Sequence, residues 1–296
     1  MELTEPRPKK CCKLSKNLPL PVILKKDGTV HRINGFFNGF SVCITDKEDM
    51  KKIISMGYFG KANLSRNYPQ FGDKRTEILR NRQYKKRKAW SEQTSSKDIR
   101  KIIVVPDSED DNEDYFTNLR PEYQIDRSGL KETVWLSLEE SFFLSETVKC
   151  LNIFNGKNIL SSEECWKLFS EADPHFKQNY IVYFHFRAKN WVVKPGIKFG
   201  GDYLLYKQGP PFFHASYVVI IDFMNEDSTR NESMLRKSLD NVSLLSLNRL
   251  CETAGKELMI CQVTGQQNED IHYTNLGSFV VNELLVKRWM LTQELS

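Results

Sequence analysis

The 296-residue sequence has no long hydrophobic run, and its cysteines are few and irregularly spaced. A membrane-spanning helix needs roughly 18 consecutive apolar residues, and no stretch of the chain approaches that length. The N-terminus is not apolar, so we expect neither a secretory signal nor a transit peptide. Seven cysteines are an odd number without Cys-x-x-Cys spacing, which argues against both a disulfide framework and a zinc site. We therefore expect a protein of the nucleus or cytoplasm, with no membrane span.

Other common metal and cofactor patterns are also missing. The acidic run at 107–114 lacks the glycine and the final glutamate that an EF-hand loop requires at fixed positions. We interpret it as a solvated linker, and we expect neither a metal site nor a cofactor.

Positive charge is present, and it is concentrated in the first third of the chain. The net charge is +5, but residues 1–101 hold 24 basic and 10 acidic residues, a local charge of +14, while the remaining 195 residues sum to −9. A basic segment of this size indicates a polyanionic partner, and nucleic acid is the first candidate.

Shifts in composition predict the organisation of the chain. We expect a mobile arm at 1–20, a small α+β subdomain at 21–72, a basic-then-acidic linker at 73–124, a helical region at 125–178 and a dense C-terminal domain at 179–296. The basic half of the linker fits a nuclear import signal, an RNA-binding helix or a merely solvated helix face.

Hydrophobic periodicity predicts an α/β fold with a mixed sheet flanked by helices. Helices are expected at 47–56, 136–145, 161–169, 180–189 and 235–252, with Ser162 as the N-cap of the third. Strands are expected at 22–24, 191–193, 202–206, 213–223 and 257–263, and a final strand and tail at 279–290.

Three residues near the ends of these strands could carry chemistry. Tyr206 ends one predicted strand and His214 begins the next, and the Gly-Pro-Pro turn between them can bring a phenol and an imidazole together. Lys256 follows the Ala-Gly end of a predicted helix, where its ammonium could meet an anionic phosphate. The alternatives are a half-buried strand tyrosine, a packed polar histidine, and a lysine that complements the helix dipole.

Two stretches of the chain resemble the tRNA-intron endonuclease family. The first runs from Phe186 to Gly200 and continues through Tyr206 and the Pro-Pro-Phe-Phe-His-Ala-Ser-Tyr motif to Tyr217. The second is the Lys256–Met259 segment. The similarity is to the catalytic subunit that cuts the 5′ splice site. Residues 56–66 also match that subunit. The resemblance implies that 179–296 is an endonuclease catalytic domain.

The resemblance also implies roles for these residues. Tyr206 falls on the family's general base, His214 on its general acid and Lys256 on the cation that stabilises the transition state. The implied reaction is metal-independent and leaves a 2′,3′-cyclic phosphate and a 5′-hydroxyl. Arg249 and Trp289 fall on a pair that sandwiches an intron base at the active site of the partner subunit. For Trp289, packing on its own domain is the alternative.

The implied partners are precursor tRNA, a second catalytic subunit and two structural subunits, forming a heterotetramer. Two other functions remain open at this point. A non-catalytic structural subunit would keep the fold and lose one or more of the three residues. An RNA-binding module would explain the basic segment but would leave the three residues as a coincidence.

Overall fold

The fold is described by a computed structural model at residues 6–9, 20–24, 28–63, 132–225, 229–236, 239–265 and 271–287. All of these residues except Glu132 belong to one compact unit, which joins the chain before residue 67 to the chain after residue 133. Most of the predicted arm at 1–20 and the whole predicted linker at 73–124 lie outside the described residues.

Six described strands form the first sheet, in the order β3-β4-β2-β1-β5-β6. β1 and β5 are parallel, and every other neighbouring pair is antiparallel. The strands are β1 (Ile33–Phe37), β2 (Val42–Ile44), β3 (Lys61–Ala62), β4 (Val134–Leu136), β5 (Leu151–Asn155) and β6 (Asn158–Ile159). Half of this sheet therefore comes from 134–159, a stretch in which the sequence pattern predicted helices.

Three helices accompany the first sheet. They are α1 (Lys47–Ser55), α3 (Leu138–Phe142), which continues as a π-helical turn (Phe143–Thr147), and α4 (Ser162–Ala172). The predicted N-cap of α4 is wrong by one residue. Ser161 caps the helix, because its hydroxyl accepts from the Glu164 N–H while the Glu164 carboxylate accepts from the Ser161 N–H. Only Ser161 has a glutamate three residues later.

Five described strands form the second sheet, in the order β11-β10-β9-β8-β7. They are β7 (Val192–Pro195), β8 (Tyr203–Tyr206), β9 (Tyr217–Met224), β10 (Glu257–Thr264) and β11 (Val280–Val286). β9 and β10 are parallel and the other pairs are antiparallel, so the sheet is mixed, as predicted. β9 is buried along nearly its whole length, which marks the centre of the core.

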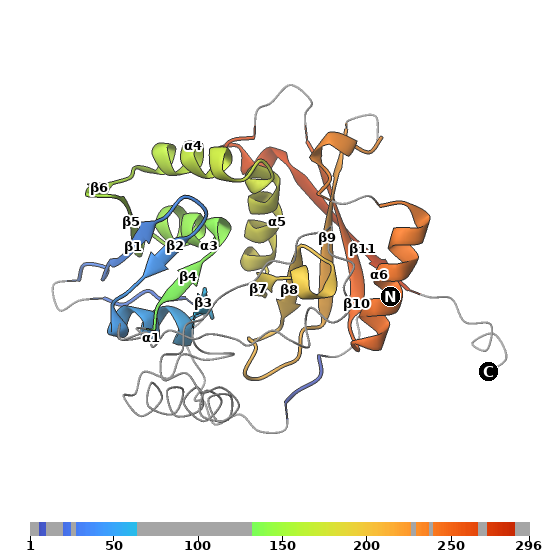
Figure 1. Ribbon diagram of the computed structural model, residues 1–296, viewed down its shortest axis with the longest axis horizontal. Coiled ribbons are helices and arrows are strands. Elements are labelled where there is room, and N and C mark those ends of the chain that lie inside the picture. Colours follow the sequence, from blue (N-terminus) through green and yellow to red (C-terminus); the bar gives the residue numbers. More distant parts are fainter. Residues whose placement is uncertain are drawn as a thin grey trace, which may run out of the picture. The chain divides into compact units, whose positions relative to one another are not determined.

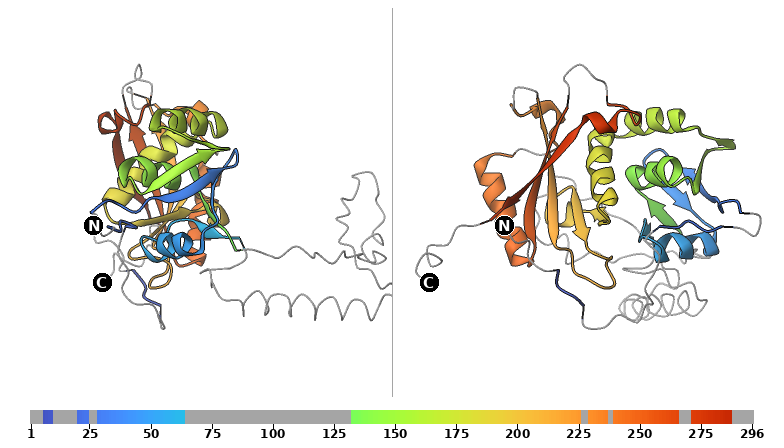
Figure 2. Two further views of the ribbon diagram at one scale, coloured as in Figure 1. Left: turned by 90° about the vertical axis from the view of Figure 1, so that its left-hand side faces the viewer. Right: turned by 180° about the vertical axis from the view of Figure 1, so that it is seen from behind.

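Two helices pack on this sheet, α5 (Phe176–Ala188) and α6 (Asn241–Thr253). They lie on opposite sides of it, and both contact β10 (Figure 1, Figure 2). α5 is buried around most of its circumference, because rings such as Phe176, Tyr180, Tyr183 and Phe186 fill the space beside the sheet. None of the described helices is long and apolar enough to cross a membrane.

Two predicted strands are shorter in the structure. The strand expected at 213–223 begins only at Tyr217, and Phe213 instead forms an isolated bridge with Pro8. The strand expected at 22–24 is reduced to one bridge between Leu24 and Val30. The α/β class and the mixed sheet are confirmed, whereas the separation into two sheets was not foreseen.

Candidate functional site

Tyr206 and His214 flank the connection between β8 and β9. Tyr206 is the last residue of β8, and His214 is exposed in the loop before β9. Gly209 shapes this loop, since its φ of +119° is left-handed and an added Cβ would lie 2.4 Å from the Tyr58 ring. Its carbonyl accepts a hydrogen bond of 3.1 Å from the Phe212 N–H. The loop that presents His214 is therefore fixed by a position that only glycine can occupy.

Lys256 lies just beyond the C-terminal end of α6. Gly255, with φ +64°, turns the chain from the helix towards β10. The Lys256 Nζ donates a hydrogen bond of 3.0 Å to the carbonyl of Ala254, the C-cap residue, and lies 4.3 Å from the centroid of the Phe199 ring. Burial lowers the pKa of Lys256. The ammonium thus complements the negative end of the helix and is also partly desolvated.

His214 and Lys256 line the same cavity. It has a volume of about 220 Å³, and its lining is Pro6, Arg7, His214, Ala215, Ser216, Glu252, Gly255, Lys256 and Glu257. The buried Ser216 hydroxyl has no hydrogen-bond partner among the described residues, so the cavity offers a neutral donor beside its cations. Within the described ranges, no group of three or more His, Cys, Asp or Glu side chains could hold a metal ion.

Tyr206 is not among the residues that line this cavity. Its half-buried ring packs against the hydrophobic cluster beneath α6, which includes Leu204, Val218 and Leu258. Burial raises the pKa of Tyr206, which opposes formation of a phenolate. The structure therefore brings together two of the three predicted residues.

The predicted base-sandwich pair is only partly described. Arg249 is exposed on α6, seven residues before Lys256, and its side chain has free access to solvent. Trp289 lies outside the described residues.

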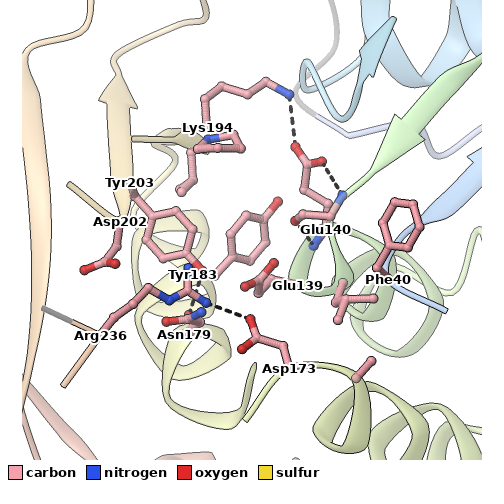
Figure 3. A pocket seen from close by; sticks show the side chains of 15 residues that line it. Phe40, Glu139, Glu140, Asp173, Asn179, Tyr183, Lys194, Asp202, Tyr203 and Arg236 are labelled. Atoms are coloured by element: carbon pink, nitrogen blue, oxygen red, sulfur yellow. Dashed lines mark hydrogen bonds and ion pairs between the residues drawn. The ribbon is translucent and has the colours of Figure 1, made fainter. Parts of the chain in front are cut away.

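A second cavity, of about 360 Å³, lies beside α3, α5 and β7 (Figure 3). Four of the six charged side chains that line it form two ion pairs. Glu140 and Lys194 form an ion pair of 3.0 Å, and Asp173 and Arg236 form one of 2.7 Å. Because these groups are satisfied within the protein, we assign this cavity a structural role.

The sequence pattern missed two neighbours of the site, Arg7 and Phe199. Arg7 falls in the predicted mobile arm. The alternating prolines of Pro6-Arg7-Pro8-Lys9 favour extended backbone, but they do not indicate which segment this one pairs with. Phe199 lies just before the Gly200-Gly201 turn of the signature run and had no distinguishing pattern of its own.

Comparison with known proteins identifies the domain that contains this site. Residues 176–273 match the family described as tRNA intron endonuclease, catalytic C-terminal domain. The matched range runs from α5 through β10 and includes Tyr206, His214 and Lys256. The C-terminal part of the chain is therefore similar to the catalytic domain of the tRNA intron endonuclease family, which confirms the resemblance.

The chain is also similar to proteins named tRNA-splicing endonuclease subunit Sen2. It is 41% identical to the Gallus gallus protein over 169 residues, which are 56% of this chain and 36% of that relative. It is 29% identical to Sen2-2 of Arabidopsis thaliana over 163 residues, 54% of this chain and 62% of the relative. The probable Sen2 of Schizosaccharomyces pombe is 26% identical over 291 residues, 78% of this chain and 74% of the relative. The alignment thus spans about a third of the length of the Gallus gallus relative.

Proposed function

We propose that this chain is a catalytic subunit of a tRNA-splicing endonuclease and cuts precursor tRNA at the 5′ splice site. One observation carries the proposal: His214 and Lys256, both inside the matched catalytic domain, line one cavity. An imidazole and an ammonium around a space of this size suit the cleavage of a phosphodiester, which needs a proton donor and a cation.

The proposed reaction is an internal transesterification. The ribose 2′ oxygen attacks the adjacent phosphorus, the bond from phosphorus to the 5′ oxygen breaks, and a 2′,3′-cyclic phosphate and a 5′-hydroxyl result. The phenolate of Tyr206 takes the proton from the 2′-hydroxyl, and His214 gives a proton to the departing 5′ oxygen. Lys256 stabilises the negative charge that develops on the phosphoryl oxygens. The reaction requires a 2′-hydroxyl and so is confined to RNA.

The position of Lys256 supports its assigned role. Its ammonium is held by the Ala254 carbonyl and the Phe199 ring, so it is oriented before the substrate arrives. A preoriented cation in a partly desolvated site stabilises developing charge more effectively than one in water.

The raised pKa of Tyr206 limits its role as a base in the free chain. We propose that Tyr206 acts on the 2′-hydroxyl only when RNA fills the site, because bound substrate supplies the alignment that the chain alone lacks. The proposed partners are a second catalytic subunit and two structural subunits, and nothing in this mechanism requires a metal ion.

The direct test is His214→Ala in the complex reconstituted with its partner subunits. We expect the rate of 5′ cutting to fall by roughly 10²–10⁴-fold, the usual contribution of a general acid, while 3′ cutting and precursor binding remain. His272→Ala is the matched control, since His272 is a half-buried histidine of the same domain that does not line the cavity. Unchanged 5′ cutting by His214→Ala would instead support the alternative of a non-catalytic structural or RNA-binding subunit.

Two chemical controls separate this mechanism from others. EDTA should leave the rate of 5′ cutting unchanged, and specific restoration of an EDTA-inhibited chemical step by a divalent ion would contradict the proposal. A precursor with a 2′-deoxynucleotide before the 5′ scissile bond should bind without being cut.

A further inference from the structure

The segment Pro6–Lys9 pairs with the loop that presents His214. The Lys9 N–H donates a hydrogen bond of 2.8 Å to the Phe212 carbonyl, and the His214 N–H donates one of 3.1 Å to the Arg7 carbonyl. Pro8 and Phe213 form an antiparallel bridge between these two bonds. The segment therefore adds a short extended strand to the active-site loop, far from its own place in the sequence.

The local sequence explains this pairing. Proline has no N–H and holds extended backbone, so Pro6 and Pro8 leave the polar groups of Arg7 and Lys9 to face the loop. The Lys9 ammonium also donates to the Pro210 carbonyl, which fixes the segment at a further point. Both the backbone and a side chain thus anchor it beside His214.

This anchoring brings the Arg7 guanidinium to the cavity that His214 and Lys256 line. A Cβ built on Gly255 would lie 3.0 Å from Arg7 Nη1, so the lack of a side chain at Gly255 leaves room for the guanidinium beside the end of α6. The carbonyl end of a helix carries partial negative charge and favours nearby cations. The C-terminal end of α6 therefore helps to hold both Arg7 and Lys256 at the cavity.

The Arg7 guanidinium forms no hydrogen bond or ion pair with any described residue, although its donors border the cavity. The carboxylates of Glu252 and Glu257 also line the cavity, and Glu257 lies 3.6 Å from the Lys287 ammonium. A guanidinium offers five donors in a fork that matches two phosphate oxygens. Arg7 is thus an unused phosphate-binding group at the site of the proposed cut.

We propose that Arg7, carried by the Pro6–Lys9 strand, binds a backbone phosphate of the RNA next to the scissile bond. This inference rests on the proposed function and names one more substrate-binding residue for it. Arg7 holds the substrate, while His214 and Lys256 act on the reacting atoms. The two other roles open to this strand, a purely structural cap of α6 and an inhibitory plug of the cavity, predict different results.

The test uses the reconstituted complex with Arg7→Ala and Arg7→Lys. Binding is measured with a precursor tRNA carrying a 2′-deoxynucleotide at the 5′ cut, and cutting with the ordinary precursor. For Arg7→Ala we expect about tenfold weaker binding and about tenfold higher KM for 5′ cutting, with kcat unchanged, as for the loss of one charge-assisted hydrogen bond. The slope of log Kd against log salt should fall by about 0.7–1, the contribution of one phosphate contact. Arg7→Lys should keep the salt slope and lose part of the affinity.

Arg32→Ala is the matched control, because it removes the same charge from an exposed arginine that does not line the cavity. It should leave KM and the salt slope of 5′ cutting unchanged. A structural cap would instead show a lowered Tm for Arg7→Ala with unchanged KM, and a plug would show faster cutting. Either result overturns the proposal.

The outcomes also separate this inference from the proposed function. If His214→Ala abolishes 5′ cutting while Arg7→Ala changes neither KM nor the salt slope, only the role of Arg7 fails. If His214→Ala cuts normally, the catalytic assignment fails, and the binding assay with the 2′-deoxy precursor still decides whether Arg7 contacts RNA.

Discussion

Lys194 and Glu140 form a largely buried ion pair of 3.0 Å that ties the second sheet to α3 beside the first sheet. Lys194 belongs to β7 and Glu140 to α3, and their side chains are only 15% and 4% exposed. Lys194 also donates to the Gly60 carbonyl at 2.8 Å, while Glu140 accepts from the Gly60 N–H at 3.0 Å. Burial lowers the pKa of Lys194, so its charge in the folded protein depends on Glu140.

We expect Glu140→Gln to destabilise the folded chain by about 3–5 kcal/mol, because it leaves a buried ammonium without its countercharge. Lys194→Met should cost a similar amount. The double variant should cost much less than the sum of the two, since it removes both charges. Urea unfolding of the four proteins measures this coupling free energy.

The exposed pair of Lys51 and Glu48, at 2.6 Å, provides the matched control. Lys51→Met should cost below about 1 kcal/mol, because solvent screens that pair. If the losses of unfolding free energy for Glu140→Gln and Lys194→Met simply add in the double variant, the ion pair does not link α3 to β7.

The second sheet could be predicted from the sequence more fully than the first. β9 and β10 are long apolar runs, and α1 was placed within one residue of its end because an acidic first turn and a regular apolar face mark it. β3, β4 and β6 have two or three residues each, too few to show alternation. β4 also pairs with β2 and β3, which are distant in sequence, and local periodicity cannot report such pairing.

The candidate site shows the same limit. His214 and Lys256 were predictable because both lie at strand ends inside a recognisable run, and parallel β9 and β10 bring those ends together. Arg7 was not predictable, because its position depends on a backbone pairing across most of the chain. The basic N-terminal third was expected to contact RNA by general charge, whereas the structure places one of its arginines at the cavity itself.

Lys256→Arg should change how 5′ cutting responds to pH. The ordinary pKa of lysine is 10.5, and burial lowers that of Lys256, so its charge is lost progressively as the pH rises towards that value. Arginine stays charged throughout this range. We therefore expect the ratio of the Lys256→Arg rate to the wild-type rate to rise with pH between about 8 and 10.

Single-turnover cutting, corrected for uncatalysed RNA hydrolysis, measures this ratio. Lys256→Met should be slow at every pH, because it never carries the charge. A ratio that stays constant across the range would contradict the assignment of a charged Lys256 to the transition state.

Tyr206→Phe tests the proposed base. Loss of the phenol should slow 5′ cutting by roughly 10²–10⁴-fold without weakening binding of the precursor.

Because burial raises the pKa of Tyr206, little phenolate is present at neutral pH. Replacing Tyr206 with a ring-fluorinated tyrosine lowers the phenol pKa and should therefore increase the rate at neutral pH. A phenol that only positions the 2′-hydroxyl predicts no such increase, so this comparison distinguishes the two roles.

Arg249→Ala should act on the active site of the partner subunit. Arg249 is exposed on α6 outside the cavity lining, so it is free to stack on a base that lies against a neighbouring subunit. Stacking contributes roughly 1–3 kcal/mol per base, and we expect 3′ cutting to slow by about 5- to 150-fold while 5′ cutting stays normal. Trp289→Ala should give the same selective defect, and the double variant should be little worse than either single one if both residues hold one base, as the resemblance implies. Ser246→Ala, at another exposed position of α6, controls for damage to the helix. Separate quantification of the two cut products decides the outcome: a defect confined to the 5′ site would place Arg249 at its own subunit's cavity instead.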